Sequence, residues 1–500
     1  MQITGDSEVM RAPRLVRKNR AHQLVSLWVL AIISSGIGAA LVWSGYEIEG
    51  GAIAVLAFAP LFWRLDRLWF PRLFAGPFIM MYLFHGLGYG VGPLWETSVI
   101  GRLSAIKEGL APAQWGGALG LATIALVFPR ALERASGRKS RSIRFRDHSG
   151  EGAGWNRYSL LLLAFSALVL AYGYRTGVMN RLNPRDVSLL QSSAISAFQS
   201  THQVMFFFLG LSAARSRKLW RIVWAAAFLA YATFFFLDGG RGTVAIALIV
   251  SLIGFVWGGA SFRFASVTLL IFTVIFIPLS GVVRLYRDAY TVNTEADRSA
   301  GFARAFDDFW ASRESIADAT EAFAWSLTAK SVDAIFISTP EFIPYIGFAE
   351  LQPALYSVIP QVIKPDRADP MEGNTLAIRY GAARLDSKGS YMPTVGDGYR
   401  RFGWLGIVFV YALLSLVYGF AVGFCWARQS RCEYMAMFIF LLIQLPGIWS
   451  SSLVGLIYTV SWILPKYFAF FWLTRRLQQL LFGKPKPVLS VRPAIQMNVA

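Results

Sequence analysis

The sequence predicts an all-α, multi-span membrane protein with about 12 transmembrane helices and one large outer loop between spans nine and ten. Apolar residues make up 55% of the 500 residues, and the mean hydropathy is +0.47. The apolar excess falls in uncharged runs of about 20 residues, the length at which a helix crosses the roughly 30 Å hydrocarbon core of a bilayer. Lys and Arg gather in every second connection between the runs, which is typical of loops that stay in the cytoplasm.

The predicted spans follow one another with short connections until the ninth is reached. They cover residues 24–43, 51–63, 73–94, 110–128, 158–174, 198–214, 222–237, 243–260, 264–283, 404–424, 434–448 and 453–473. Connections after even-numbered spans are mostly basic, whereas those after odd-numbered spans are acidic, mixed or polar. The positive-inside rule therefore predicts both termini in the cytoplasm and the large loop on the outer side, which is the periplasm in a Gram-negative bacterium.

This topology divides the chain into five segments. They are a cytoplasmic basic tail (1–23), a bundle of spans one to nine (24–283), the large periplasmic loop (284–402), spans ten to twelve (403–476) and a cytoplasmic tail (477–500). Within the loop, apolar residues recur every three or four positions from Phe302 to Leu327, and charged residues occupy the other face. This pattern predicts an amphipathic helix that lies on the membrane or caps the bundle. Six prolines follow between residues 340 and 370, and we interpret the whole loop as a folded lid.

The net charge of +19 would suggest a nucleic-acid partner in a soluble protein. Here basic cytoplasmic loops account for the charge, so we expect no nucleic-acid partner. The only cysteines, Cys425 and Cys432, lie in one short connection and can form neither a disulfide framework nor a CxxC metal pair. No Asp-x-Asp motif occurs, and the pairs Glu47/Glu49 and Glu295/Asp297 are weak metal candidates. We therefore expect neither a metal ion nor another cofactor.

Arg241 lies in the turn Asp238-Gly239-Gly240-Arg241-Gly242-Thr243, at the predicted outer start of span eight. A helix N-terminus carries unpaired N–H groups and a positive dipole end, and Gly240 and Gly242 let a bound group approach the backbone. These features predict a pyrophosphate site at the lipid interface. The alternative is a snorkelling interfacial arginine.

Two further arginines, Arg284 and Arg287, leave span nine three positions apart and share a helical face if the helix continues. They are candidates for binding the same anionic ligand as Arg241, and the alternative is an anchor against lipid headgroups.

The loop closes with the segment Pro393-Thr394-Val395-Gly396-Asp397-Gly398-Tyr399-Arg400-Arg401-Phe402-Gly403, directly before span ten. Asp397 is our first candidate for a carboxylate that accepts a proton from a sugar hydroxyl. The alternative is an Asp-Gly turn that caps span ten. Tyr399 and Arg400 are candidate substrate-binding residues, as are Glu372 and Asn374 in the middle of the loop, for which the alternative is a structural role.

The glycine-arginine turn, the long outer loop with Glu372-Gly373-Asn374-Thr375 and the closing segment together resemble O-antigen polymerases of the Wzy type. The similarity extends from about span five to span twelve. The family usually has Glu where this chain has Asp397. The resemblance implies a GT-C-like membrane glycosyltransferase that joins repeat units carried on a polyprenyl pyrophosphate lipid at the outer face of the inner membrane. Its substrate and membrane lipid are then the expected partners, and a chain-length regulator is a further candidate.

Under this hypothesis, Arg241, Arg284 and Arg287 hold the pyrophosphate of the donor and Asp397 activates the hydroxyl of the incoming unit. Three rival functions stay open. An O-antigen ligase has a similar layout but uses a histidine in its large loop, and residues 284–402 contain none. A transporter or flippase for lipid-linked sugars usually has ionisable residues along a midplane path and related halves, neither of which is evident here. A sensor or structural membrane protein leaves the arginine turn unexplained.

Overall fold

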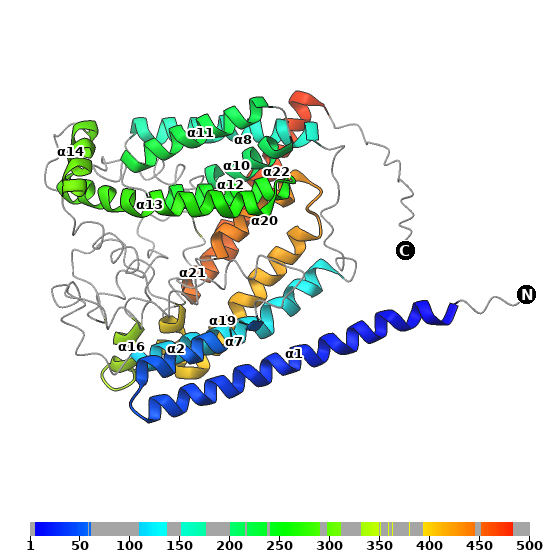
Figure 1. Cartoon of the computed structure of the whole chain (residues 1–500), viewed down its shortest axis with the longest axis vertical. Helices are drawn as coiled ribbons and strands as arrows, with labels where there is room; N and C mark the ends of the chain where they lie inside the picture. Colours follow the sequence, from blue (N-terminus) through cyan, green and yellow to red (C-terminus); the bar gives the residue numbers. More distant parts are fainter. Residues whose placement is uncertain are drawn as a thin grey trace, which may run out of the picture. The chain divides into compact units, whose positions relative to one another are not determined.

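Figure 1 shows the computed structural model of the chain. The described residues are 6–58, 60–61, 110–137, 152–176, 201–215, 218–237, 241–290, 298–311, 332–349, 351, 359, 363, 380, 394–445 and 452–483. These residues form helices joined by turns, and no strand occurs among them. The chain is therefore an all-α protein in the part that the structure describes, as its apolar pattern predicts.

Seven of the described helical segments are long and apolar enough to cross a membrane. They are Val25–Trp43, Pro112–Ser136, Gly154–Thr176, Lys218–Phe236, Arg263–Val283, Thr394–Trp426 and Leu453–Phe482. Two shorter apolar helices, Gly242–Trp257 and Cys432–Gln444, coincide with predicted spans eight and eleven. The protein is thus a multi-pass membrane protein. The count of twelve spans stays a prediction, because span two is represented by only 11 helical residues and span three lies outside the described residues.

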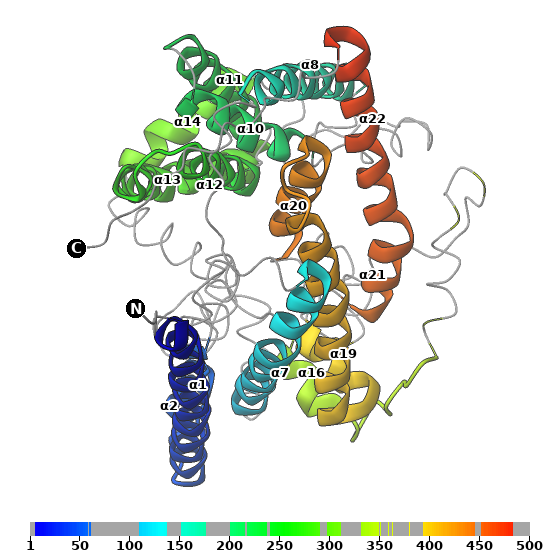
Figure 2. The same ribbon diagram turned by 90° about the vertical axis from the view of Figure 1, so that its right-hand side faces the viewer.

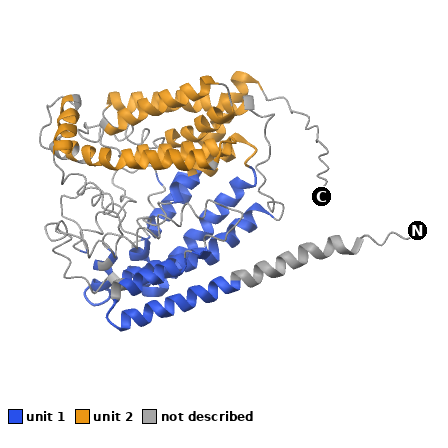
Figure 3. Ribbon diagram, in the orientation of Figure 1, with its two compact units in different colours: residues 1–143, 312–428, 441–465 blue, residues 144–311, 429–440, 466–500 orange. Residues whose placement is uncertain are grey.

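The chain divides into two compact units (Figure 3). Unit 1 comprises residues 1–143, 312–428 and 441–465, and unit 2 comprises residues 144–311, 429–440 and 466–500. The helices lying wholly in unit 1 are α1 (Asp6–Trp43), α2 (Glu47–Ala57), α7 (Leu110–Ser136), α16 (Val332–Ser338), α19 (Thr394–Trp426), α21 (Leu453–Tyr458) and the π-helical turn η5 (Thr459–Ile463). Those lying wholly in unit 2 are α8 (Gly152–Thr176), α10 (Thr201–Arg215), α11 (Lys218–Leu237), α12 (Arg241–Trp257), α13 (Phe262–Tyr290) and α14 (Arg298–Ala311). Helices α20 (Cys432–Gln444) and α22 (Leu464–Phe482) contribute residues to both.

In unit 1, α7 and α19 form a close helix pair, and Figures 1 and 2 both show them side by side. Glycines bring the two helices together. A Cβ on Gly120 would collide with the ring of Tyr411, and a Cβ on Gly423 would collide with the backbone carbonyl of Leu132. Small residues at helix contacts are the usual way in which membrane helices gain packing without a hydrophobic driving force. The α7–α19 pair therefore forms the frame on which the start of α19 is held.

In unit 2, α10 and α12 approach each other in the same way, with Gly210 and Gly254 against the backbones of Ser251 and Phe207. Helix α14 packs on α13, where the ring of Phe302 lies 5.5 Å from that of Tyr286. This helix covers the first part of the predicted amphipathic segment, and residues 312–331 lie outside the described residues.

Two helices reach into the segment that the sequence predicts as loop. Helix α13 continues to Tyr290, so Arg284 and Arg287 lie on a helix, one turn apart. Helix α19 already begins at Thr394 and is interrupted at Phe402 and Gly403, whose backbone angles are not helical. The closing segment of the predicted loop is therefore a short helical piece, residues 394–401, followed by a kink and the long piece from Trp404 onward.

Candidate functional site

The short helical piece 394–401 carries three charged side chains with no solvent exposure: Asp397, Arg400 and Arg401 are each 0% exposed. They lie three and four positions apart, so one helix turn brings both guanidinium groups to the same carboxylate. Glycine permits this burial. A Cβ on Gly398 would lie 2.8 Å from Ile407 Cα, and one on Gly406 would collide with the carbonyl of Gly398. The short piece can thus fold back onto the start of the long one.

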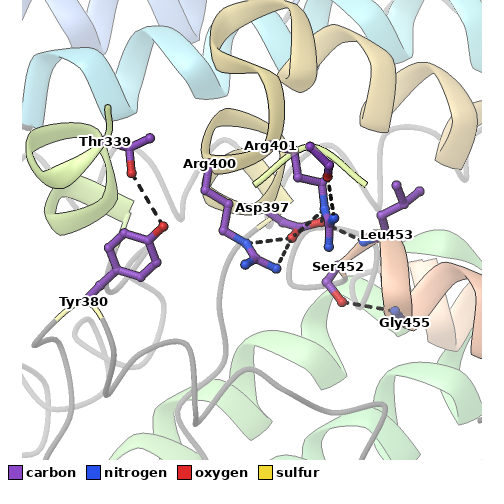
Figure 4. A network of polar contacts seen from close by, with 9 residues as sticks. Thr339, Tyr380, Asp397, Arg400, Arg401, Ser452, Leu453 and Gly455 are labelled. Atoms are coloured by element: carbon purple, nitrogen blue, oxygen red, sulfur yellow. Dashed lines mark hydrogen bonds and ion pairs between the residues drawn. The ribbon is translucent and has the colours of Figure 1, made fainter. Parts of the chain in front are cut away.

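Both carboxylate oxygens of Asp397 accept several hydrogen bonds (Figure 4). Oδ1 accepts from Arg400 Nε at 2.9 Å and lies 2.7 Å from Arg400 Nη2. Arg401 Nε lies 3.2 Å from each carboxylate oxygen. Oδ2 also accepts from the backbone N–H of Leu453 at 2.7 Å. Charge-assisted bonds of this kind are about twice as strong as neutral ones.

The bond from Leu453 ties the start of α19 to the start of α21, although the two residues are 56 positions apart in the chain. Leu453 is the first residue of α21, where backbone N–H groups have no partner inside the helix. The Ser452 hydroxyl caps the same helix by accepting from Gly455 N–H at 3.0 Å. Asp397 therefore supplies a second cap, and its negative charge lies at the positive end of the helix dipole.

Arg401 connects the piece 394–401 to the turn at residues 346–347. Its Nη1 donates to the Gly347 carbonyl at 2.9 Å, and Gly347 N–H returns a bond to the Arg401 carbonyl at 3.1 Å. Ile346 N–H donates to the Arg400 carbonyl at 3.1 Å. These bonds satisfy carbonyls that lose their helical partners at the kink. Arg401 Nη2 is buried and has no hydrogen-bond partner among the described residues.

Tyr399 lies in an aromatic cluster with Phe336, Tyr345 and Trp404. Its ring stacks on Phe336 with centroids 4.0 Å apart, and it meets Trp404 edge-on at 5.7 Å. A side-chain hydrogen bond joins Tyr399 to Tyr345. Close by, the Thr339 hydroxyl and the Tyr380 hydroxyl are 3.5 Å apart (Figure 4). The cluster packs the tyrosine into the unit, so its side chain is largely buried.

Asp397, Arg400 and Arg401 together carry a net charge of +1, since one carboxylate faces two guanidinium groups. A buried charge is costly unless it is paired, and here two guanidinium groups share one carboxylate. Such a cluster is suited to an anion. Asp397, in turn, is already engaged by two side chains and a backbone N–H, which is the geometry of a carboxylate that positions its neighbours.

Of the predicted site residues in unit 1, Asp397 and Arg400 contact each other, whereas Tyr399 of the same helical piece packs in the aromatic cluster. The predicted residues of unit 2 are Arg241, which is the first residue of α12, Gly242 beside it, and Arg284 and Arg287 near the end of α13. Gly240, Glu372 and Asn374 lie outside the described residues. That the arginine turn faces the end of the large loop therefore stays a prediction.

Arg401 and the Leu453 backbone are members of the cluster that were not among the predicted site residues. The Arg401 signal is present in the sequence, because an Asp followed by Arg at positions three and four is a favourable helix pattern. The spacing of Asp397 and Arg401 indicates a contact only if residues 394–401 are predicted to be helical. Nothing in the sequence indicates the bond from Leu453. Comparison of the chain with models of protein families, with curated protein sequences and with solved structures finds no match.

Proposed function

We propose that this protein is a membrane glycosyltransferase that polymerises oligosaccharide repeat units carried on polyprenyl pyrophosphate, at the outer face of a bacterial inner membrane. The observation that carries the proposal is the buried Asp397–Arg400–Arg401 cluster in the segment that resembles the closing motif of such polymerases. A polymerase of this kind needs cations at the membrane boundary, because its leaving group is a lipid pyrophosphate.

In the proposed reaction, a hydroxyl oxygen of the incoming unit attacks the anomeric carbon of the growing chain. The bond from that carbon to the pyrophosphate oxygen breaks, and the lipid pyrophosphate departs with the bonding electrons. Arg241, Arg284 and Arg287 bind the pyrophosphate and stabilise its developing charge. The hydroxyl proton passes to a carboxylate, for which Asp397 is the first candidate.

The contacts of Asp397 add a second candidate role for this residue. To accept a proton, the carboxylate has to release at least one of the bonds from Arg400, Arg401 and Leu453 N–H. A carboxylate that keeps these bonds instead positions the two guanidinium groups for the anionic donor. The two roles differ in kinetics, since loss of a base lowers kcat while loss of positioning raises the KM for the donor.

An O-antigen ligase is the nearest alternative function. It would transfer the finished chain to a lipid acceptor instead of extending it. The family uses a histidine in its large outer loop, and the four histidines of this chain all lie outside residues 284–402. The acceptor that the purified protein requires distinguishes a ligase from a polymerase. A polymerase uses a second lipid-linked repeat unit as its acceptor and needs no other.

A transporter for lipid-linked saccharides is the second alternative, and deletion of the gene separates it from a polymerase. In cells without a polymerase, single repeat units still cross the membrane and appear on the surface. In cells without a flippase, lipid-linked units accumulate facing the cytoplasm. We expect single surface units, and an inward-facing pool would overturn the proposal.

The role of Arg241 is tested by Arg241→Ala, with Arg263→Ala as the matched control. Arg263 is an exposed arginine near the start of α13, at the end of the helix opposite Arg284. Removing a donor that stabilises the leaving group should lower polymer synthesis roughly 100-fold. Polymer length and amount are measured at matched protein levels. If Arg241→Ala behaves like Arg263→Ala, the arginine does not act on the donor.

A further inference from the structure

Helix α14 has three faces that differ in chemistry. One face is buried and carries Ala305 and Phe309, which are 5% and 1% exposed. The second face carries Phe306 and Trp310, four positions apart, with ring centroids separated by 6.1 Å. These two side chains are 43% and 52% exposed. The apolar surface of the helix is therefore wider than the part that packs against the protein.

The third face is charged and consists of Arg304, Asp307 and Asp308, all exposed. At 100° per residue, Phe306 and Trp310 lie between the buried face and these charges. The order around the helix is thus protein contact, exposed aromatic pair, then charge. This order is typical of a helix lying in the plane of a membrane interface.

The contacts of α14 place it at the end of a membrane span. Phe302 packs on Tyr286, three residues beyond the apolar window Arg263–Val283 of α13. At a rise of about 1.5 Å per residue, Tyr286 lies about 4.5 Å past the end of that window. Helix α14 also contacts α11, another membrane span of the same unit. Figure 1 shows α14 beside the end of α13.

We propose that α14 is a membrane-interface helix whose Phe306 and Trp310 insert between lipid headgroups. The exposed apolar surface of α13 supports lipid as the contact of these two rings. Leu285, which lies beyond the apolar window of α13, is 39% exposed and extends this apolar surface to the level of α14. Aromatic side chains are enriched at this depth of a bilayer. The helix then holds the start of the large polar segment at the membrane surface. This role is independent of the chemistry that the protein performs.

The net charge of the charged face of α14 determines whether that face attracts anionic headgroups. Arg304, Asp307 and Asp308 carry a net charge of −1, so this face provides no attraction to anionic headgroups. We therefore attribute insertion to the aromatic pair and expect it in zwitterionic vesicles as well as in vesicles that contain an anionic lipid. A basic amphipathic helix would instead require the anionic lipid.

A fluorescent probe at single cysteines tests the proposal in the full-length protein. Both native cysteines, Cys425 and Cys432, are buried and are replaced by serine. Single cysteines are introduced by Phe306→Cys and, as the matched control, Asp308→Cys on the charged face. An environment-sensitive dye is attached, and each protein is reconstituted in phosphatidylcholine vesicles with or without phosphatidylglycerol. Brominated lipid then quenches probes in the bilayer, and iodide quenches probes in water.

The probe at position 306 should be quenched by brominated lipid at least about threefold more strongly than the probe at 308, in both vesicle types. The probe at 308 should be quenched mainly by iodide. Strong iodide quenching at both positions would place α14 in water and overturn the proposal. Protection of position 306 from both quenchers would show a protein contact, from a second copy or another segment, and would also overturn it. Trp310→Cys repeats the measurement if the first variant does not fold.

Discussion

Asp397 is the residue on which the described part of the candidate site depends. It holds two buried arginines of its own helical piece and the first N–H of α21, so the starts of α19 and α21 meet at one carboxylate. Removing one member of a buried ion-pair cluster leaves the other charged groups without that partner. This costs more stability than replacing the whole cluster by apolar residues. The side chain is therefore expected to matter for stability as well as for any reaction.

The first prediction concerns Asp397→Asn, which keeps the shape of the side chain and removes its charge. The buried guanidinium groups of Arg400 and Arg401 then lose the carboxylate that they share, and we expect a loss of about 3–5 kcal/mol in stability. Thermal unfolding of the purified protein in detergent measures this loss. Asp307→Asn on the exposed face of α14 is the matched control and should change stability by less than about 0.5 kcal/mol.

Asp397→Glu separates the two roles of the carboxylate in the same experiments. The glutamate retains the charge but moves it by one methylene in a fully buried site. If Asp397 positions the arginines, the variant should partly restore stability and raise the KM for the lipid-linked donor. If it is the base, kcat should fall while the KM for the donor stays unchanged. Unchanged stability in Asp397→Asn would contradict the buried cluster itself.

At this scale the sequence indicates residues 394–401 as a candidate site but does not indicate their contacts. Asp397, Tyr399 and Arg400 lie in one short helical piece beside a membrane span, and their roles in a reaction stay predictions. Arg401 and Leu453 were missed for different reasons. The Arg401 contact depends on residues 394–401 being helical, and the Leu453 contact joins residues 56 positions apart, which no local pattern can indicate.

The kink in α19 is the element that makes the cluster possible. Gly403 has φ +62° and ψ −146°, a backbone conformation that residues other than glycine rarely adopt. The kink lets Gly398 approach Gly406 and turns the carbonyls of Arg400 and Arg401 toward Ile346 and Gly347. The short piece 394–401 can therefore pack beside the long one instead of extending the span in a straight line.

The second prediction is that Gly403→Ala destabilises the protein by about 1–3 kcal/mol through backbone strain alone. A Cβ at this position would also lie 3.0 Å from the Tyr345 hydroxyl. Both effects act next to the cluster, so polymer synthesis should fall in parallel with stability. Thermal unfolding and polymer amount are measured together. Gly36→Ala is the control, because its added Cβ has no atom within 4 Å and it should be neutral. If Gly403→Ala and Gly36→Ala had the same stability and polymer amount, the kink would not be needed for the cluster.

The spans predicted from the sequence agree best with the helices of the structure where the apolar runs are long. Spans one, four, five, seven, nine, ten and twelve each correspond to a long apolar helix in the described residues. The start of α19 was predicted as loop because Pro393, two glycines and three charges precede Gly403. Tertiary bonds from residues 346–347 and from Leu453 override that local signal.

At the scale of the whole molecule, the sequence predicts a topology that the described helices do not by themselves test. The contact pattern divides the predicted large loop, since residues up to 311 belong to unit 2 and those from 312 to unit 1. Such a division depends on contacts between distant parts of the chain and cannot be obtained from hydropathy. The sidedness of the loop and of the termini can be measured directly.

The third prediction is the sidedness of four exposed positions in the cysteine-free protein. Ser44→Cys and Glu341→Cys should react with a membrane-impermeant maleimide in cells whose outer membrane is permeable. Glu133→Cys and Ser430→Cys should react only after the inner membrane is broken. The positive-inside rule gives this pattern, because Arg130, Arg134, Arg428 and Arg431 flank the second pair. Labelling of Glu341→Cys only after lysis would move the large loop to the cytoplasm.

The most direct test of the proposed function uses the purified full-length protein in lipid vesicles with one defined polyprenyl-pyrophosphate-linked repeat unit. We expect a ladder of products that differ by one repeat unit, formed without any other acceptor and also in the presence of EDTA. Arg241→Ala should lower the rate of its formation roughly 100-fold, while Arg263→Ala should leave that rate unchanged. Folded, monodisperse protein that binds the lipid-linked unit but forms no product longer than one repeat would contradict the proposed polymerase function.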